Sequence, residues 1–457
     1  MKLYRFRSNL EYAKDELKRD YFHFSDETEL NDPQEGFVKL FWKGDVVLWK
    51  NLLKHYLYTL ANTVMQVALG NDSVSDDLPI FFDEGHFPTE NCKSLFEDIR
   101  ADFFNQKDIK EFLDYVVKLN HLIFQAELIF YLRMIHYCAL SIVIEKFKQK
   151  ELLNWDLGAA VFKEIGIFSK FTTLVPKIEN KYKDFFPVMY KAAQSIFYEF
   201  DFSFKYNSKN IKQIKNKNLL LVDFPALYVT QLKRLVFYSP CIACFMENYK
   251  SPAIWGYYAN CHKGICLIFD DDKNNSKIHF NLEKDKTIIS TETQKVVYKK
   301  EYKEIDFFRM IGTISLYGLE NFWLKDWEGN YSSLIKVDDN VLTKEWHKEY
   351  IKNMMESYTT KIPAWKHENE HRIILEKEFF AMNSTDAKEV FYDFRLLKGI
   401  IFGLKTNESE KYEIIELIKE KCEKSKRSDF KFYQAEYDES LGEISLVELK
   451  NLAESQN

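Results

Sequence analysis

The sequence contains few of the residues that make tight turns. Its 457 residues include 14 glycines and 9 prolines, and both residue types interrupt helices. We therefore expect few turns and a fold in which helices dominate. The seven cysteines stand at scattered spacings that do not form a disulfide framework. This cysteine usage favours a reducing compartment, so we predict a cytoplasmic protein.

The sequence also lacks a strong charge excess and a long uninterrupted apolar run. Its formal net charge is −6, which argues against broad electrostatic coating of nucleic acid but leaves a local basic groove open. The opening residues, Met1–Arg7, have no apolar signal core behind their charges. The most apolar stretch, 121–144, is interrupted by Gln125, Glu127 and Arg133. We interpret this stretch as a buried helix and predict no membrane partner.

Four well-known catalytic motifs are missing. The sequence has no Gly-x-x-x-x-Gly-Lys-Ser/Thr loop, no Gly-x-Gly-x-x-Gly, no Gly-x-Ser-x-Gly and no His-Glu-x-x-His. Their absence disfavours P-loop ATPases, Rossmann dehydrogenases, α/β-hydrolases and zincins. Zinc ligation by Cys241 and Cys244 with Cys261, His262 and Cys266 is also disfavoured, because the first two would face opposite sides of a strand. We predict no metal site and interpret the cysteines as small buried side chains.

Aromatic and aliphatic residues are abundant, since the chain has 39 Phe and 27 Tyr and 46% of its residues are hydrophobic. The first 25 residues predict a strand, a helix and a second strand. Apolar residues then recur at three- and four-residue spacing, which is typical of helices with one buried face. The predicted helices of this region cover 46–69, 95–118, 121–148, 158–170 and 178–198.

After a polar break at 216–218 the pattern changes to short β-branched and aromatic runs. These runs predict strands at 219–222, 236–245, 265–269, 277–280, 296–298, 372–375, 397–402 and 430–435. Further helices are predicted at 223–235, 251–260, 301–325, 341–360 and 407–424. The predicted fold class is α+β. A mixed or antiparallel sheet domain would comprise 1–41 and 218–457, and an all-helical insertion would comprise 42–217.

Three clusters of polar and aromatic residues indicate a site. They cover 30–36, 255–264 and 363–372, and the last two place a Trp, a His and charged groups just before a short apolar strand. Core packing does not require such polar density at strand ends. We therefore expect the three segments to line one pocket.

These clusters, with their neighbours, occur in a recognisable order. The pieces are Tyr4-Arg5-Phe6, Phe24-Ser25, Leu30-Asn31-Asp32-Pro33-Gln34-Glu35, Cys244-Phe245, Ile254–Asp270, Trp365–Ile373, Ile400–Gly403 and the strand 430–435. In this combination they resemble the bacterial domain-of-unknown-function family 2971. The resemblance covers 1–40 and 218–437 and leaves the helical block unmatched. That family carries no settled activity.

The same order is also similar, more distantly, to the ADP-ribosyltransferase superfamily. That resemblance implies an Arg or His on the first strand, a hydroxyl residue on a second strand and a late Glu, often in a Glu-x-Glu pair. Here Arg5 (or Tyr4), Ser25 and Glu368-Asn-Glu370 stand in those places. It implies NAD as the substrate that supplies ADP-ribose, and a bacterial toxin or phage-defence setting.

Residue roles follow from that resemblance. Glu370 would be the main catalytic carboxylate, because cleavage of the nicotinamide–ribose bond develops positive charge. Glu368, predicted on the same strand face, would deprotonate the acceptor, and His262 would be an acid–base group or a ligand contact. The remaining predicted NAD-binding residues are Tyr4, Arg5, Ser25, Asn31, Trp255, Tyr258 and Arg372.

Each of these residues also has a structural interpretation. Glu370 and Arg372 would form a plain ion pair, His262 would cap a helix C-terminus, Trp255 would anchor the core, and Asn31 would belong to a rigid turn. Function is correspondingly open between three classes. The first is an ADP-ribosyltransferase-like enzyme that modifies a protein or nucleic acid. The second is a non-enzymatic nucleotide or peptide sensor whose helical insertion docks a regulatory protein, and the third is a metal-dependent hydrolase or nuclease.

Overall fold

The computed structural model describes residues 1–457 except 76, 82–84, 86, 154–185, 208–215, 217, 271–278, 285–286, 335–343, 377–387 and 451–457. The chain divides into two compact units. The first unit comprises Met1–Phe37, Tyr238–Lys303 and Met354–Asn457, and the second comprises Val38–Phe237 and Glu304–Asn353.

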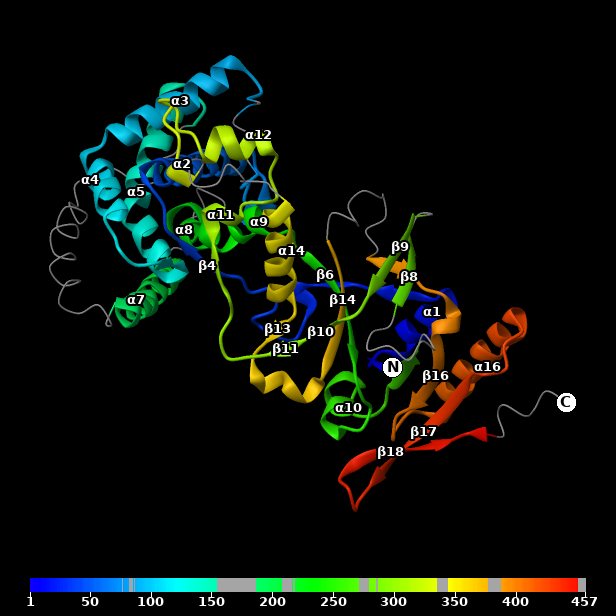
Figure 1. The fold of residues 1–457 in the computed structure, drawn as a ribbon. Helices are drawn as coiled ribbons and strands as arrows, with labels where there is room; N and C mark the ends of the chain where they lie inside the picture. Colours follow the sequence, from blue (N-terminus) through cyan, green and yellow to red (C-terminus); the bar gives the residue numbers. More distant parts are fainter. Residues whose placement is uncertain are drawn as a thin grey trace. The chain divides into compact units, whose positions relative to one another are not determined.

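A mixed sheet forms the centre of the first unit (Figure 1). Over the described residues it has nine strands in the order β10-β14-β6-β1-β7-β16-β17-β18, and β3 also pairs with β6. The bounds are β1 Leu3–Arg7, β3 Ser25–Asp26, β6 Pro240–Met246, β7 Ile265–Phe269, β10 Gln294–Lys295, β14 Glu370–Glu376, β16 Leu397–Phe402, β17 Lys431–Asp438 and β18 Glu443–Glu448. β16 and β17 run parallel, whereas β1, β7 and β16 form antiparallel pairs in the middle of the sheet.

Side chains alternate along the central strands and so enter two separate cores. Leu3 and Phe245 belong to the core that packs against α1 and α16, while Phe6 and Trp255 belong to the core under α10. The bounds of these helices are α1 Leu10–Arg19, α10 Pro252–Tyr258 and α16 Glu408–Ser425. The two cores hold the central strands in place from both faces, which gives the site below a fixed support.

Smaller elements complete the first unit. They are β2 Tyr21–His23, β8 His279–Lys284, β9 Thr287–Glu292 and β15 Glu389–Phe391 in one four-stranded sheet, β11 Val297–Tyr298 and β13 Thr360–Lys361 in a parallel pair, and the 3-10 helix η8 Pro363–Glu368. Proline at the start of η8 suits a helical first turn, where no N–H is needed. Asn369 follows with φ of 43°, a left-handed conformation that asparagine tolerates. This turn carries the chain from η8 into β14.

The second unit is mainly helical. Its longer helices are α2 Val46–Ala68, α3 Glu90–Asn105, α4 Lys107–Val117, α5 Gln125–Gln149, α7 Phe186–Asn207 and α8 Phe224–Gln231. The shorter ones are α9 Lys233–Val236, α11 Phe307–Met310, α12 Leu316–Gly318, η2 Asp72–Ser75, and the π-helical η6 Leu219–Asp223 and η7 Leu319–Trp323. A small sheet joins β12 Glu304–Asp306, β4 Lys39–Trp42 and β5 Ile123–Phe124. α14 Lys344–Tyr358 contains the boundary between the two units.

Within the described residues, α5 is the one helix with the length and hydropathy of a membrane span, and 72% of its apolar window is buried inside the protein. Such burial is what a core helix shows, as predicted for 121–144. Asp45 begins α2 by accepting hydrogen bonds from the backbone of Val47 and Leu48, which stabilises the helix start. The helical texture expected between 46 and 148 is thus present in α2 to α5.

The α+β class and the mixed sheet are confirmed, but several element predictions are wrong. The run 219–222 is helical, because four consecutive aliphatic residues suit a buried helix as well as a buried strand. The single helix predicted at 301–325 is instead a strand followed by short helices. The helix predicted at 158–170 lies outside the described residues. The predicted boundaries of the insertion, 42 and 217, stay a prediction; the compact second unit also takes in 304–353.

Candidate functional site

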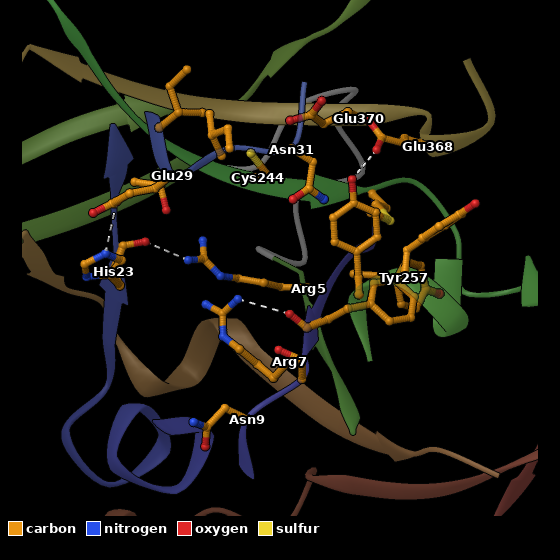
Figure 2. Close-up of a pocket in the computed structure, with 18 of the residues that line it drawn as sticks. Arg5, Arg7, Asn9, His23, Glu29, Asn31, Cys244, Tyr257, Glu368 and Glu370 are labelled. Carbon is orange, nitrogen blue, oxygen red and sulfur yellow. Dashed lines mark hydrogen bonds and ion pairs between the residues drawn. The ribbon is translucent and has the colours of Figure 1, made fainter. Parts of the chain in front are cut away.

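A pocket of about 420 Å³ lies in the first unit where two central strands separate. β1 and β6 pair at one position only, Tyr4 with Met246. Farther along, β6 pairs with β3 through Ser25 and Ile242. Side chains from β1, β3 and β6 line the opening between the separated strands (Figure 2). The volume is in the range of small-molecule sites.

Seven of the ten predicted site residues line this pocket: Tyr4, Arg5, Ser25, Asn31, Tyr258, Glu368 and Glu370. They come from all three chain segments that make up the first unit, and the fold brings them together. In Figure 2, Glu368 and Glu370 lie on one side of the pocket and Arg5 and Arg7 lie on the other. The pocket therefore has two charged sides of opposite sign.

The remaining three predicted residues do not line the pocket. Trp255 is fully buried, where its Nε1 donates to the Tyr249 carbonyl at 2.7 Å and its ring meets Phe6 edge-on. His262 has φ of 69° in the turn after α10, and its carbonyl accepts from the Lys405 backbone. Arg372 is fully buried and donates hydrogen bonds to Glu370. Trp255 thus takes the place that its structural interpretation describes, and His262 lies in the turn that follows α10.

The basic cluster consists of Arg5, Arg7 and Glu16. Arg7 forms a two-bond ion pair with the buried Glu16 carboxylate. Arg5 donates from Nη2 to the His23 carbonyl at 2.8 Å, while Glu16 is 3.9 Å away. Two arginines against one carboxylate give the cluster a formal charge of +1.

Arg5 has unused hydrogen-bonding capacity. It is 5% exposed, yet its Nε and Nη1 have no hydrogen-bond partner. Its guanidinium instead lies 4.9 Å from the Phe22 ring and 5.2 Å from the Phe245 ring. Burial, and after it the neighbouring charge of Arg7, lowers the pKa of Arg5 to about 9. Arg5 is thus a buried cation with two donor nitrogens that have no hydrogen-bond partner.

The acidic cluster consists of Glu35, Glu368, Glu370, Lys361 and Arg372. The Lys361 ammonium bridges Glu370 at 2.7 Å and Glu368 at 2.9 Å. Glu368 also accepts a hydrogen bond from the Tyr258 hydroxyl. Three carboxylates against two cations give this cluster a formal charge of −1, opposite in sign to the basic cluster.

Arg372 is the support of the acidic cluster. It donates from Nε and Nη2 to Glu370 at 2.9 and 3.1 Å, and from both Nη atoms to Glu35 at 2.5 and 2.8 Å. A further bond runs from Nη1 to the Tyr358 carbonyl. Burial alone would raise the pKa of Glu370, but Arg372 and Lys361 outweigh it and lower that pKa to about 2. Glu370 therefore stays ionised at neutral pH.

The prediction that Glu368 and Glu370 share a strand face is wrong. Glu368 ends η8, Asn369 turns the chain in the left-handed conformation, and Glu370 is the first residue of β14. Both carboxylates still line the same pocket, and the Lys361 ammonium pairs with both of them. The spacing of two residues is therefore produced by a turn and not by strand alternation.

The Asn31-Asp32-Pro33 segment forms the turn that we predicted. The Asp32 carboxylate accepts from the Gln34 backbone at 2.9 Å, and the Asp32 carbonyl accepts from the Glu35 backbone at 2.9 Å. This turn places Asn31 on the pocket and directs Glu35 to Arg372. One rigid loop therefore supplies both a lining residue and part of the acidic cluster.

Sequence reasoning missed Lys361, Arg7 and Glu16. Arg7 lies two positions after Arg5 on β1, so strand alternation was the available signal for it. Lys361 carried no comparable signal, because lysine in a charged sequence is usually exposed. Glu29 also lines the pocket and pairs with Lys388 at 3.2 Å.

Cys241 and Cys244 enter opposite sides of β6, as the strand period requires. Cys241 lies in the core with α1 and α16, whereas Cys244 lines the pocket. Across the described part of the chain, no group of three His, Cys, Asp or Glu side chains could hold a metal ion.

Residues 254–373 match a family described as "Protein of unknown function (DUF2971)". The matched stretch contains Tyr258 and four members of the acidic cluster, while Arg5 lies outside it. The chain matches no curated protein. It matches no solved structure either.

Proposed function

We propose that this protein is an ADP-ribosyltransferase-like enzyme that takes ADP-ribose from NAD. The observation that carries the proposal is the division of one pocket into a buried cluster of charge +1 and a buried cluster of charge −1. NAD has the matching division, with an anionic pyrophosphate at its centre and a cationic nicotinamide ring at one end. The pocket and this substrate are therefore complementary in charge.

Arg5 is the proposed pyrophosphate contact. Its Nε and Nη1 donors have no partner, and a guanidinium fork matches two phosphate oxygens. Ser8 and Asn9 line the pocket at the start of α1, where the helix dipole adds partial positive charge. An anion that enters this side would satisfy donors that are otherwise buried without partners, and it would gain from the low local dielectric.

Glu370 is the proposed catalytic carboxylate. When the bond between ribose C1′ and the nicotinamide nitrogen breaks, its electron pair leaves with neutral nicotinamide and positive charge grows on the ribose. A carboxylate held in place stabilises that charge in the transition state. An acceptor oxygen, nitrogen or sulfur then attacks C1′ and gives its proton to a base, for which Glu368 is the proposed residue. Arg372 and Lys361 hold the two carboxylates in place.

One observation favours a non-enzymatic alternative. Glu370 is 2% exposed and both of its oxygens already meet cations, as in a structural ion pair. In that case the pocket would bind a nucleotide or an anionic peptide without chemistry. The two functions differ in whether nicotinamide is released.

The test is incubation of the purified full chain with labelled NAD, alone and with cell extract separated into protein, RNA and DNA. A chelator arm addresses the metal-dependent alternative. Glu370→Gln is the key variant. Glu247→Gln is its matched control, because Glu247 pairs with His371 and Lys295 next to β14 but does not line the pocket.

We expect transfer or nicotinamide release by the wild type and by Glu247→Gln, and a loss of at least about 100-fold in Glu370→Gln. The labelled fraction would identify the acceptor class. If the folded wild type binds NAD but releases no nicotinamide in any fraction, the sensor function replaces the enzyme.

A further inference from the structure

Lys361 holds an unusual position in the first unit. Its ammonium lies within 4 Å of three carboxylates, Glu370 at 2.7 Å, Glu368 at 2.9 Å and Glu35 at 3.9 Å. All three are buried or nearly so. Lys361 is the cation that bridges the two pocket-lining carboxylates, since Arg372 reaches Glu370 and Glu35 but has no bond to Glu368.

The position of Lys361 is fixed by elements on several sides. It belongs to β13, which pairs with β11, and its ammonium lies 5.5 Å from the Trp365 ring of η8. The titratable and charged groups around it are Glu370 and Arg372 on β14, Glu368 on η8, Glu35 in the loop before β4, Cys244 on β6, Tyr258 on α10, Tyr298 on β11, and Tyr302. Among these, Arg372 is the second cation, and it donates to both oxygens of Glu370, one of which also meets Lys361.

The negative charge of both buried carboxylates depends on the ammonium that lies close to them. Without a cation between them, the repulsion of like charges favours protonation of one carboxylate. Burial opposes the charge of Lys361, but Glu370, Glu368 and Glu35 outweigh burial and the repulsion of Arg372, and they raise its pKa. The ammonium is therefore charged at neutral pH.

We propose that Lys361 is a positioning residue for the proposed reaction, whose ammonium keeps Glu368 and Glu370 together and both ionised on the pocket wall. The inference rests on the proposed function, in which Glu370 stabilises the ribose cation and Glu368 accepts a proton. Both roles require an ionised carboxylate. Lys361 acts through the two glutamates and does not react itself. A protonated Glu368 could not accept a proton from the acceptor, and a protonated Glu370 would stabilise the ribose cation less.

The test compares Lys361→Met, which keeps the side-chain length but removes the charge, with Lys361→Arg, which keeps the charge. Lys421→Met is the matched control, because Lys421 is also partly buried and pairs with Asp20 in the same unit but does not line the pocket. Nicotinamide release is measured from about pH 5 to about pH 8.

We expect the wild type, Lys361→Arg and Lys421→Met to vary by less than about twofold over this range. In Lys361→Met the rate should fall about tenfold from pH 8 to pH 5, because one carboxylate then titrates in between. A Lys361→Met profile that runs parallel to the wild-type profile would overturn the proposal, whatever the size of the loss.

A second readout does not depend on activity. In Lys361→Met one of the two neighbouring carboxylates should take up a proton on folding, so stability relative to the wild type should fall as pH rises from 5 to 8. The double variant Lys361→Met/Glu368→Gln removes one cation and one anion and should restore the wild-type profile. Absence of NAD turnover with this stability pattern present would reject the proposed function but keep the charge role of Lys361. A Lys361→Met stability profile parallel to that of the wild type would reject that role.

Discussion

Two buried arginines of the first unit, Arg372 and Arg5, have opposite hydrogen-bonding states. Arg372 is 0% exposed and donates to two carboxylates and a backbone carbonyl from all three of its nitrogens. Arg5 is 5% exposed, makes one hydrogen bond and leaves Nε and Nη1 without a partner. Both side chains belong to strands that border the same pocket.

The difference separates a charge that internal hydrogen bonds fully satisfy from one that they satisfy only in part. A buried donor without a partner costs about 1–3 kcal/mol, and native proteins keep few of them. Arg372 has no such cost, so its contacts are consistent with a structural role. Arg5 carries the cost for two donors without an internal partner, which supports its proposed role as an anion contact.

The largest effect should come from Arg372→Met. This change leaves Glu35 and Glu370 buried with fewer cations, and we expect the first unit to lose about 3–5 kcal/mol of unfolding free energy. Urea unfolding followed by a probe in the first unit would measure it. Arg427→Met is the control, because Arg427 is also buried but pairs with the exposed Asp429. A loss below about 1 kcal/mol would remove the structural role of Arg372.

The second-largest effect should come from low pH, which weakens the acidic cluster. The folded-state pKa of Glu370 is lowered to about 2, below its unfolded value. Its stabilising contribution is therefore complete above the unfolded pKa and is lost as pH falls from about 4.5 towards 2, on the order of 3 kcal/mol. Unfolding measured at several pH values should show a steeper acid loss in the wild type than in Glu370→Gln. Equal slopes would mean that Glu370 does not hold this charge.

Arg5→Met should give the converse result to Arg372→Met. Stability should stay within about 1 kcal/mol of the wild type, because the variant removes a buried charge with unpaired donors. Affinity for ADP-ribose, which carries the pyrophosphate without nicotinamide, should fall about 10- to 100-fold, as expected when charge-assisted hydrogen bonds are lost. Calorimetric titration would measure the affinity. Unchanged affinity with lowered stability would make Arg5 structural.

The smallest effect should come from a third arginine, Arg19. It is more exposed and pairs with Glu389 and Asp15 at 2.7 Å. Solvent and salt screen such pairs, so Arg19→Met should change unfolding free energy by about 0–1 kcal/mol and ADP-ribose affinity not at all. Thermal and urea unfolding would check this. A loss near that of Arg372→Met would show that burial does not divide the arginines as described.

The sequence predicted the class of the fold and seven of the 21 residues that line the pocket. Short β-branched runs located the central strands, and the polar residues at their ends located Asn31, Tyr258, Glu368 and Glu370. Local pattern could not distinguish strand from helix at 219–222, because both bury a short aliphatic run. Trp255 and His262 were placed in the site although their surroundings are a core and a helix-ending turn.

Which charged side chains are fully hydrogen-bonded could not be predicted from sequence. The opening between β1 and β6 depends on their pairing at one position, and that pairing is set by contacts distant in sequence. The bridge at Lys361 depends on η8 and the turn at Asn369, which place Glu368 seven and Glu370 nine residues after it. Likewise, Arg5 and Arg372 are the same residue type, and only the three-dimensional arrangement shows which one is fully bonded.

The most direct measurement is equilibrium binding of NAD and NADH to the wild type and to Arg5→Met. The two dinucleotides share the pyrophosphate but differ in the charge of the nicotinamide ring. We expect the wild type to favour NAD by about tenfold, because one positive charge meets the acidic cluster, and Arg5→Met to weaken both ligands by the same factor. Equal affinity for NAD and NADH, or no effect of Arg5→Met, would contradict a pocket divided by charge.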